Sequence, residues 1–251
     1  MPKWFASEVI GTFIMVFLGL GIVAGSVTTD ATEGIFQIAA VWGLGLACAI
    51  YLTTHHSEAH FNPAITLAFA FQTDFPKRRI PGYFAAQLLG AFIAASAVFF
   101  LFESQISAFE ESRHITRGDA ASVATARIFG EYYPESVSHI NAICAEFLGT
   151  LLLALVIFGF TANENKSGPG PMTPIAIGMA LTTLICVFAP LTQAGFNPAR
   201  DLAPRFFSAI AGWKTVPFSH NGIGWLTVYV LAPCGGALTG AWIGNFLFSR
   251  K

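Results

Sequence analysis

Charged side chains are scarce in this sequence, and their scarcity excludes an ordinary soluble domain. Only 11% of the 251 residues are Asp, Glu, Lys or Arg, whereas a soluble domain carries about 25%. Hydrophobic residues make up 54% of the chain, so polar groups cannot cover its surface and the outside must face lipid. The formal net charge of −1 gives no basis for a nucleic-acid partner, and we expect none.

Cysteine is also scarce, and the residue patterns of an enzyme are missing. The four cysteines all lie inside apolar runs: Cys48, Cys144, Cys186 and Cys234. None stands at metal-ligand spacing, and a disulfide framework would place them in loops. We predict that they are small buried apolar residues. We find no nucleophile–base pair, phosphate-binding loop or convincing set of metal ligands, so we expect neither catalysis nor a cofactor.

Long apolar runs are abundant in this chain. A bilayer core of about 30 Å requires roughly 20 apolar residues in a helix. Four of the runs that approach this length contain no charged residue, and the other two contain Glu8 and Glu146. The sequence therefore predicts six membrane-spanning helices, over residues 4–24, 35–53, 83–102, 142–161, 175–191 and 225–248.

The basic residues predict the orientation in the membrane. If the six spans alternate in direction, Lys3, residues 77–79, Lys166 and residues 250–251 fall on one side. Cytoplasmic loops carry an excess of Lys and Arg, so we place this side and both termini in the cytoplasm. The net-acidic connection 103–138 then lies outside a cell membrane that the chain crosses several times.

The two halves of the chain resemble each other. SEVIGTFIMVFLG matches AEFLGTLLLALVI, which places Glu8 opposite Glu146, and HFNPAITLAFA matches GFNPARDLAPR, which places Asn62 opposite Asn197. Each half has three spans, so the halves enter the membrane in opposite directions, and the binding or conduction site is expected at their interface. We predict one channel domain over 1–251, with a first half at 4–102, an outer connection at 103–138 and a second half at 139–248.

Each half carries an Asn-Pro-Ala tripeptide, at residues 62–64 and 197–199, before an apolar stretch of about ten residues that is too short to cross. Asn is a preferred N-cap and Pro suits the first helical position, so each tripeptide predicts an abrupt helix start. In inverted halves the two starts face each other near the midplane. Their partial positive charges, about +0.5 each, would repel protons and cations, while the Asn62 and Asn197 amides would donate to a passing solute. The tripeptides are Asn62-Pro63-Ala64 and Asn197-Pro198-Ala199.

With these motifs the chain resembles the major intrinsic protein family, the aquaporins and aquaglyceroporins, from Glu8 to Gly244. NPARD, with Asp201 after Arg200, resembles the glycerol-facilitator branch, as do VWGLGLACAIYLT around Trp42 and the outer segment RHITRGDAASVATARIFGEYYP. The resemblance implies an all-α membrane protein with six transmembrane helices and two re-entrant half-helices in an inverted 3+3 repeat. It also implies a homotetramer with one pore per subunit, which passes glycerol, similar small neutral solutes and water and excludes protons and ions.

The family's outer constriction maps by motif onto Trp42, Ile185, Ala194 and Arg200. Glycerol facilitators usually have a small residue at the position of Ile185 and an aromatic one at that of Ala194. The set here is closer to plant nodulin-like intrinsic proteins, which the resemblance associates with glycerol and, in some members, undissociated lactic acid or metalloid hydroxides. A channel mainly for water, lactic acid or metalloid hydroxides is therefore an alternative.

Two intramembrane carboxylates, Glu8 and Glu146, suggest a function by default. In our preferred interpretation each accepts N–H bonds from a re-entrant loop and satisfies backbone groups that have no other partner. The alternative is a proton relay in a coupled organic-acid transporter. The remaining residues expected to line the pore or support its loops are His60, Phe61, Gly195, Phe196 and Asp201.

Two smaller patterns complete the predictions. His55, His56 and Glu58 are interpreted as solvated residues at the cytoplasmic mouth, with a metal site or a pH gate as the alternative. Gly236, Gly240 and Gly244 repeat at four-residue spacing, which predicts a close helix contact within the subunit.

Overall fold

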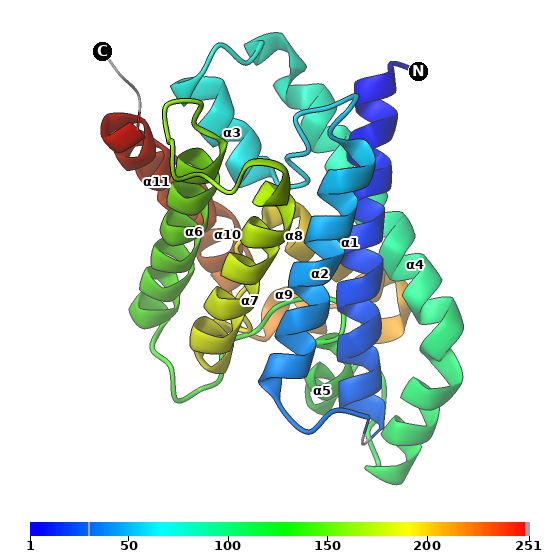
Figure 1. The fold of residues 1–251 in the computed structure, drawn as a ribbon. Helices are drawn as coiled ribbons and strands as arrows, with labels where there is room; N and C mark the ends of the chain where they lie inside the picture. The colour runs from blue at the N-terminus through cyan, green and yellow to red at the C-terminus, as the bar shows by residue number, and fades with distance from the viewer. Residues whose placement is uncertain (30, 249–251) are drawn as a thin grey trace.

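The computed structural model describes residues 1–29 and 31–248, and within these ranges every regular element is a helix. Six helical segments are long and apolar enough to cross a membrane, which confirms the six predicted spans (Figure 1). They are α1 (Lys3–Thr28), α2 (Ile35–Thr53), η1 with α4 (Lys77–Arg79, Ile80–Ser112), α6 (His139–Thr161), η3 with α7 (Gly170–Met172, Thr173–Thr192), and α10, η5 and α11 (Gly224–Leu226, Thr227–Leu231, Ala232–Phe248).

The third span is longer than its apolar run. Helix α4 continues to Ser112, ten residues past the predicted end, because its last turns pack on the outer connection although they carry charge. Ile106 is fully buried there, and the Glu110 carboxylate forms an ion pair of 2.8 Å with Arg117. The connection that follows contains only the short elements η2 (Ala120–Ser122) and α5 (Val123–Ala126).

Two short helices begin at the Asn-Pro-Ala tripeptides, as predicted. Helix α3 (Pro63–Gln72) has Asn62 as its N-cap, and helix α8 (Pro198–Ser208) has Asn197. The side-chain oxygens accept hydrogen bonds from Ala64 N at 2.9 Å and Ala199 N at 3.0 Å. Ten and eleven residues of helix extend about 15–17 Å, half of a bilayer core. Helix α8 leads through η4 (Ala209–Trp213) and α9 (Val216–Ser219) to the last span.

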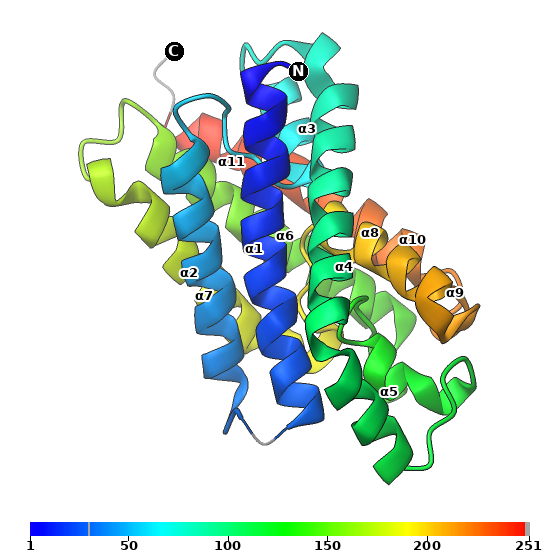
Figure 2. The same cartoon turned by 90° about the vertical axis from the view of Figure 1, so that its right-hand side faces the viewer.

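The two halves interlock through these short helices. In the first half, α1 lies between α2 and α4 (Figure 2), and in the second half α6 packs on α7 and α11. Helices α2 and α7 join the halves directly. Each short helix packs mainly on the opposite half's last span, α3 on α11 and α8 on α4. The symmetry predicted from the sequence repeat is therefore present as an exchange of half-helices between the two bundles.

The glycine repeat in α11 packs within the chain, against α6. A Cβ at Gly236 would lie 2.2 Å from the Phe147 carbonyl oxygen, and one at Gly240 would lie 2.1 Å from that of Leu151. Only a residue without a side chain allows the two backbones to approach this closely. The predicted contact within one subunit is confirmed.

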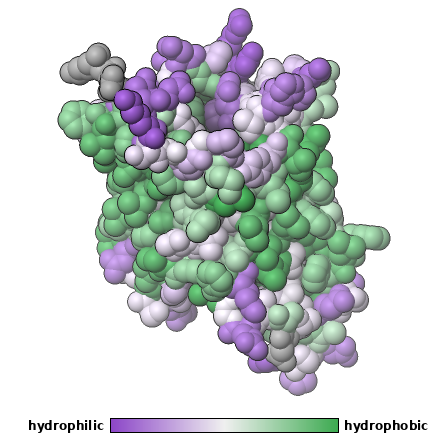
Figure 3. Space-filling model, in the orientation of Figure 1, coloured by the Kyte–Doolittle hydropathy of each residue, from purple (hydrophilic) through white to green (hydrophobic). Residues whose placement is uncertain are grey.

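On the face that Figure 3 shows, apolar side chains cover the middle of the molecule between two more polar ends. Large side chains such as Phe100 and Phe246 are 83% and 76% exposed, which suits hydrocarbon and not water. Cys48 and Cys144 also face outward, so the prediction that all four cysteines are buried is wrong for these two. Spans that are apolar on every face carry no periodicity that distinguishes the lipid side from the interior.

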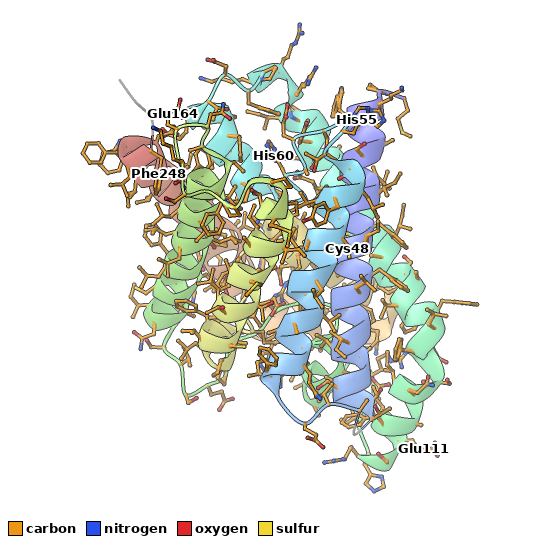
Figure 4. The ribbon with its side chains drawn as sticks, in the orientation of Figure 1. Cys48, His55, His60, Glu111, Glu164 and Phe248 are labelled. Carbon is orange, nitrogen blue, oxygen red and sulfur yellow. The ribbon has the colours of Figure 1, made fainter. Side chains whose placement is uncertain are left out.

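The beginning of α1 and the end of α11 lie at the same end of the molecule (Figure 1). His55 and Glu164 are also at that end, and Glu111 is at the opposite one (Figure 4). An even number of crossings requires this arrangement. The positions of Arg250 and Lys251, which the orientation prediction used, lie outside the described residues, and the side of the membrane that each end faces stays a prediction.

Candidate functional site

The starts of the two half-helices are tied to each other across the interface between the halves. Asn62 Nδ2 donates to the Phe196 carbonyl oxygen at 2.8 Å, and Asn197 Nδ2 donates to the Phe61 carbonyl oxygen at 2.8 Å. We call this pair of hydrogen bonds the half-helix clamp. Each side-chain amide has two N–H donors, so the clamp uses one of them and the second stays available to a solute. The expected role of the two amides as solute donors is thereby narrowed to one N–H from each side chain.

The loops that lead to these starts adopt the same unusual backbone. Phe61 has φ 50° and Phe196 has φ 54°, in the left-handed region that costs a non-glycine residue roughly 1–2 kcal/mol. Their rings lie directly over Gly11 and Gly149, where an added Cβ would be 2.1 Å from each ring's Cε1. The two glycines therefore provide the space in which each strained loop is held down by its own phenyl ring.

Glu8 satisfies the backbone of the first loop. Its Oε1 accepts from His60 N at 3.0 Å and Ser57 Oγ at 2.9 Å. Its Oε2 accepts from Phe61 N at 2.9 Å and Gln87 Nε2 at 2.8 Å. The carboxylate is fully buried, and four donors surround it.

Glu146 has the equivalent position in the second half. Its Oε1 accepts from Gly195 N at 2.9 Å and Thr192 Oγ1 at 2.6 Å, and its Oε2 accepts from Phe196 N at 2.7 Å. These are hydrogen bonds of the kind that the loop-support interpretation requires. Glu146 and Glu8 are not among the residues that line the two cavities described next.

A cavity of about 340 Å³ runs between the two halves past the clamped half-helix starts. Along α2 its wall extends from Trp42 to Thr54, twelve residues or about 18 Å of helix. The wall contains both apolar and polar side chains. Its apolar side chains include Leu46, Ile50, Ile65, Phe69, Leu153, Ile157, Ile177 and Leu181, and its polar side chains include Glu58, His60, Asn62, Gln193, Asn197 and Arg200.

A second cavity of about 270 Å³ adjoins the first beside Trp42 and Arg200. The two share Trp42, Ile185, Arg200, Gln193 and Glu131 in their walls, so the two cavities meet at these side chains. Of the predicted constriction residues, Ala194 lines only the larger cavity. The Arg200 guanidinium carbon lies 4.4 Å from the centre of a Trp42 ring, within the range of a cation–π interaction.

The outer connection supplies the partners that hold Arg200. Arg200 Nη1 donates to the Phe129 carbonyl oxygen at 3.3 Å, and Nη2 forms an ion pair with the Glu131 carboxylate. Glu131 is not among the residues predicted for the site, because in the sequence it looks like one more acidic residue in an acidic loop. Neither periodicity nor motif spacing links it to a residue 69 positions later.

Asp201 anchors this connection instead of lining the passage. Its carboxylate accepts from Glu131 N at 2.7 Å and from Arg205 Nε at 2.9 Å. Arg205 also donates to the Glu131 carbonyl oxygen. Both Asp201 and Arg205 are buried, so the pair fixes the backbone of the segment whose side chain reaches Arg200.

The histidines are divided between the passage and the surface. His60 lines the larger cavity, and its Nδ1 lies 3.1 Å from Thr66 Oγ1. His55 and His56 are exposed, with ring centres 4.6 Å apart. Within residues 1–29 and 31–248, no three His, Cys, Asp or Glu side chains gather as a metal site requires, so the metal alternative for His55, His56 and Glu58 lacks its ligand cluster.

Six spanning segments, two clamped half-helices from inverted halves and a passage lined by polar and apolar side chains define a multi-pass membrane channel. The chain belongs to the major intrinsic protein family, whose family model matches residues 2–244. This confirms the family named by the sequence motifs. The family consists of passive channels, so the protein is not an enzyme.

Individual relatives cover nearly the whole chain. The glycerol uptake facilitator protein of Escherichia coli K12 is 36% identical over 244 residues, 97% of this chain and 86% of the relative. The propanediol uptake facilitator of Salmonella typhimurium is 33% identical and covers 98% of this chain and 93% of its own. The X-ray structure of the aquaglyceroporin from Plasmodium falciparum superposes with a TM-score of 0.84 at 28% identity and covers 96% and 94% of the two chains.

Replacing Glu146 by Gln tests the loop-support role. The variant has one acceptor oxygen where the carboxylate accepts from three donors, so at least one buried N–H or O–H loses its partner, at about 1–3 kcal/mol. We expect a lower thermal unfolding midpoint in detergent and lower water flux in liposomes. The exposed Glu164→Gln is the matched control. Unchanged stability together with loss of proton-dependent uptake would favour the relay.

Proposed function

We propose that the protein is a passive channel for glycerol and similar small uncharged solutes, which also passes water and excludes protons and ions. The observation that carries this proposal is a passage wall that combines apolar and polar side chains. Glycerol has hydroxyl groups along a short carbon chain, so its oxygens can exchange hydrogen bonds with the polar groups while its C–H groups contact the apolar ones. The similarity to glycerol and propanediol uptake facilitators supports this solute class.

The proposed constriction consists of Trp42, Ile185, Ala194 and Arg200. Arg200 has donors in a fixed fork that can bind solute hydroxyl groups, while Trp42 and Ile185 face the carbon chain. The small side chain of Ala194 leaves the proposed constriction open at a position where a larger side chain would narrow it. This combination resembles the nodulin-like type, so water, urea and undissociated lactic acid belong among the solutes to be compared.

Exclusion of protons and cations is proposed to act at Asn62 and Asn197. Both half-helices present their N-terminal ends there, each equivalent to about +0.5 charge. A cation would meet both ends in a passage with little water to screen them. A neutral solute would meet the remaining amide N–H donors instead.

We further propose a homotetramer in the cell membrane with both termini in the cytoplasm, each subunit being one channel domain over 1–251. Support for the orientation comes from Lys3 and Lys77–Arg79 at the end that holds α1's first turn and from the positive-inside rule. Support for the tetramer comes from the family. Light scattering of the detergent-solubilised protein should give four 26.8 kDa chains per particle, and a monomer mass would contradict it.

Stopped-flow light scattering on proteoliposomes tests the channel function. Glycerol and water should enter much faster than in empty liposomes, without saturation and without sensitivity to an uncoupler, because no step consumes a proton. Urea and lactic acid, each at two pH values, define the solute range. Uptake that saturates at low concentration and collapses with the uncoupler would instead indicate a coupled transporter using Glu8 or Glu146.

Replacing Ala194 by Phe tests the assignment of the constriction. The ring would narrow the passage, so we expect glycerol flux to fall more than water flux, because glycerol is the wider solute. Ala85→Phe introduces the same ring on the exposed face of α4 and should change neither. Equal loss of both fluxes in Ala194→Phe would count against this assignment.

A further inference from the structure

Glu131 occupies an unusual place for an acidic residue of an outer loop. Only 1% of its surface is exposed, yet it reaches the walls of both cavities at the constriction. Its carboxylate forms an ion pair with Arg200. Among the described residues, no side chain or backbone group hydrogen-bonds to either carboxylate oxygen. The side chain is thus committed to a single partner, and that partner faces the passage.

The other charged groups near Arg200 and Glu131 already have partners of their own. Arg205 is used by Asp201, at 2.8 and 2.9 Å, and Glu146 is used by the loop N–H groups. Arg200 keeps only a carbonyl oxygen of the connection besides Glu131. The charged and titratable neighbours of Glu131 are Arg200, Asp201 and Arg205 on α8, Glu146 on α6, Tyr229 in η5 and the adjacent Tyr132.

We propose that Glu131 is a positioning and specificity-determining residue of the constriction. Its carboxylate holds the Arg200 guanidinium against Trp42 and cancels the charge there, and protonation of Glu131 releases Arg200 into the passage. This inference rests on the proposed channel function. It adds to the proposed constriction a residue that lies outside both half-repeats. It also predicts that solute flux depends on pH.

The charge of the constriction can change only through the carboxyl group. A guanidinium is not deprotonated in proteins, so a paired site has net charge 0 and a site with protonated Glu131 has +1. Burial raises the pKa of Glu131 to about 8, against the opposing effect of Arg200. The neutral acid therefore predominates below that value and the ion pair above it. A freed guanidinium retains its full charge and attracts water, so it obstructs a neutral solute and admits small anions.

The test compares wild type, Glu131→Gln and Glu131→Asp in proteoliposomes, with glycerol, water and formate as probes from about pH 6 to about pH 9. Wild-type glycerol flux should rise with pH through a midpoint near 8. Glu131→Gln should be flat at the low-pH level, about three- to tenfold below wild type at the alkaline end, a change of roughly 1 kcal/mol in the barrier. Glu131→Asp should keep a pH dependence with a shifted midpoint. Glu135→Gln, the same change at an exposed position of the same loop, should match wild type.

The anion probe separates a role in charge from a purely structural one. In Glu131→Gln, formate flux should rise relative to glycerol while sodium stays excluded, whereas a loosened fold would lower all fluxes together. A pH response that persists in Glu131→Gln, as one from His55 or His56 would, overturns the proposal, and so does a flat wild-type profile. Absence of wild-type glycerol flux at every pH would reject the channel function instead.

Discussion

The architecture depends on how two stretches of non-helical backbone survive at membrane depth. Each stretch exposes N–H groups that hydrocarbon cannot satisfy, and every unsatisfied group there would cost several kcal/mol. Glu8 and Glu146 meet this need, since each accepts the N–H of Phe61 or Phe196 and of the residue before it. A carboxylate suits the position because it is acceptor-only and can take several bonds at once. Without these anchors the half-helix starts would have no fixed place, and neither would the passage beside them.

Both half-repeats contain the same supports for their loops, but they place different side chains in the passage. Asn62 and Asn197 make the same cap and the same cross-bond in both halves. Three residues further on, the first half has Ile65 and the second has Arg200. Because the halves are inverted, this one difference gives the passage a direction, with a guanidinium beside Trp42 toward one end and an aliphatic side chain in the corresponding place. The proposed selectivity therefore depends on a position at which the two halves differ.

The features that the sequence predicted well are those decided by local chemistry. Apolar length determines the spans, and Asn before Pro63 or Pro198 determines a helix start wherever the segment lies. Features decided by contacts between distant segments could not be predicted in this way. The outward positions of Cys48 and Cys144 depend on which face of an apolar helix meets a neighbour. Glu131 reaches the site only because the outer connection folds back onto the second half. The residues around Glu131 in the sequence do not predict that contact.

In the proposed constriction, that fold-back brings together three parts of the chain, the two half-repeats and a segment with no counterpart in the repeat. The segment contributes the Phe129 carbonyl oxygen and the Glu131 carboxylate, and Asp201 and Arg205 lock its backbone in place. Asp201 therefore influences the passage although it does not line it, since it positions the residue that positions Arg200. A connection of this kind can change without disturbing the loop supports or the half-helix clamp. Solute preference can consequently vary through the outer connection while the membrane frame, which must satisfy every buried backbone group, remains the same.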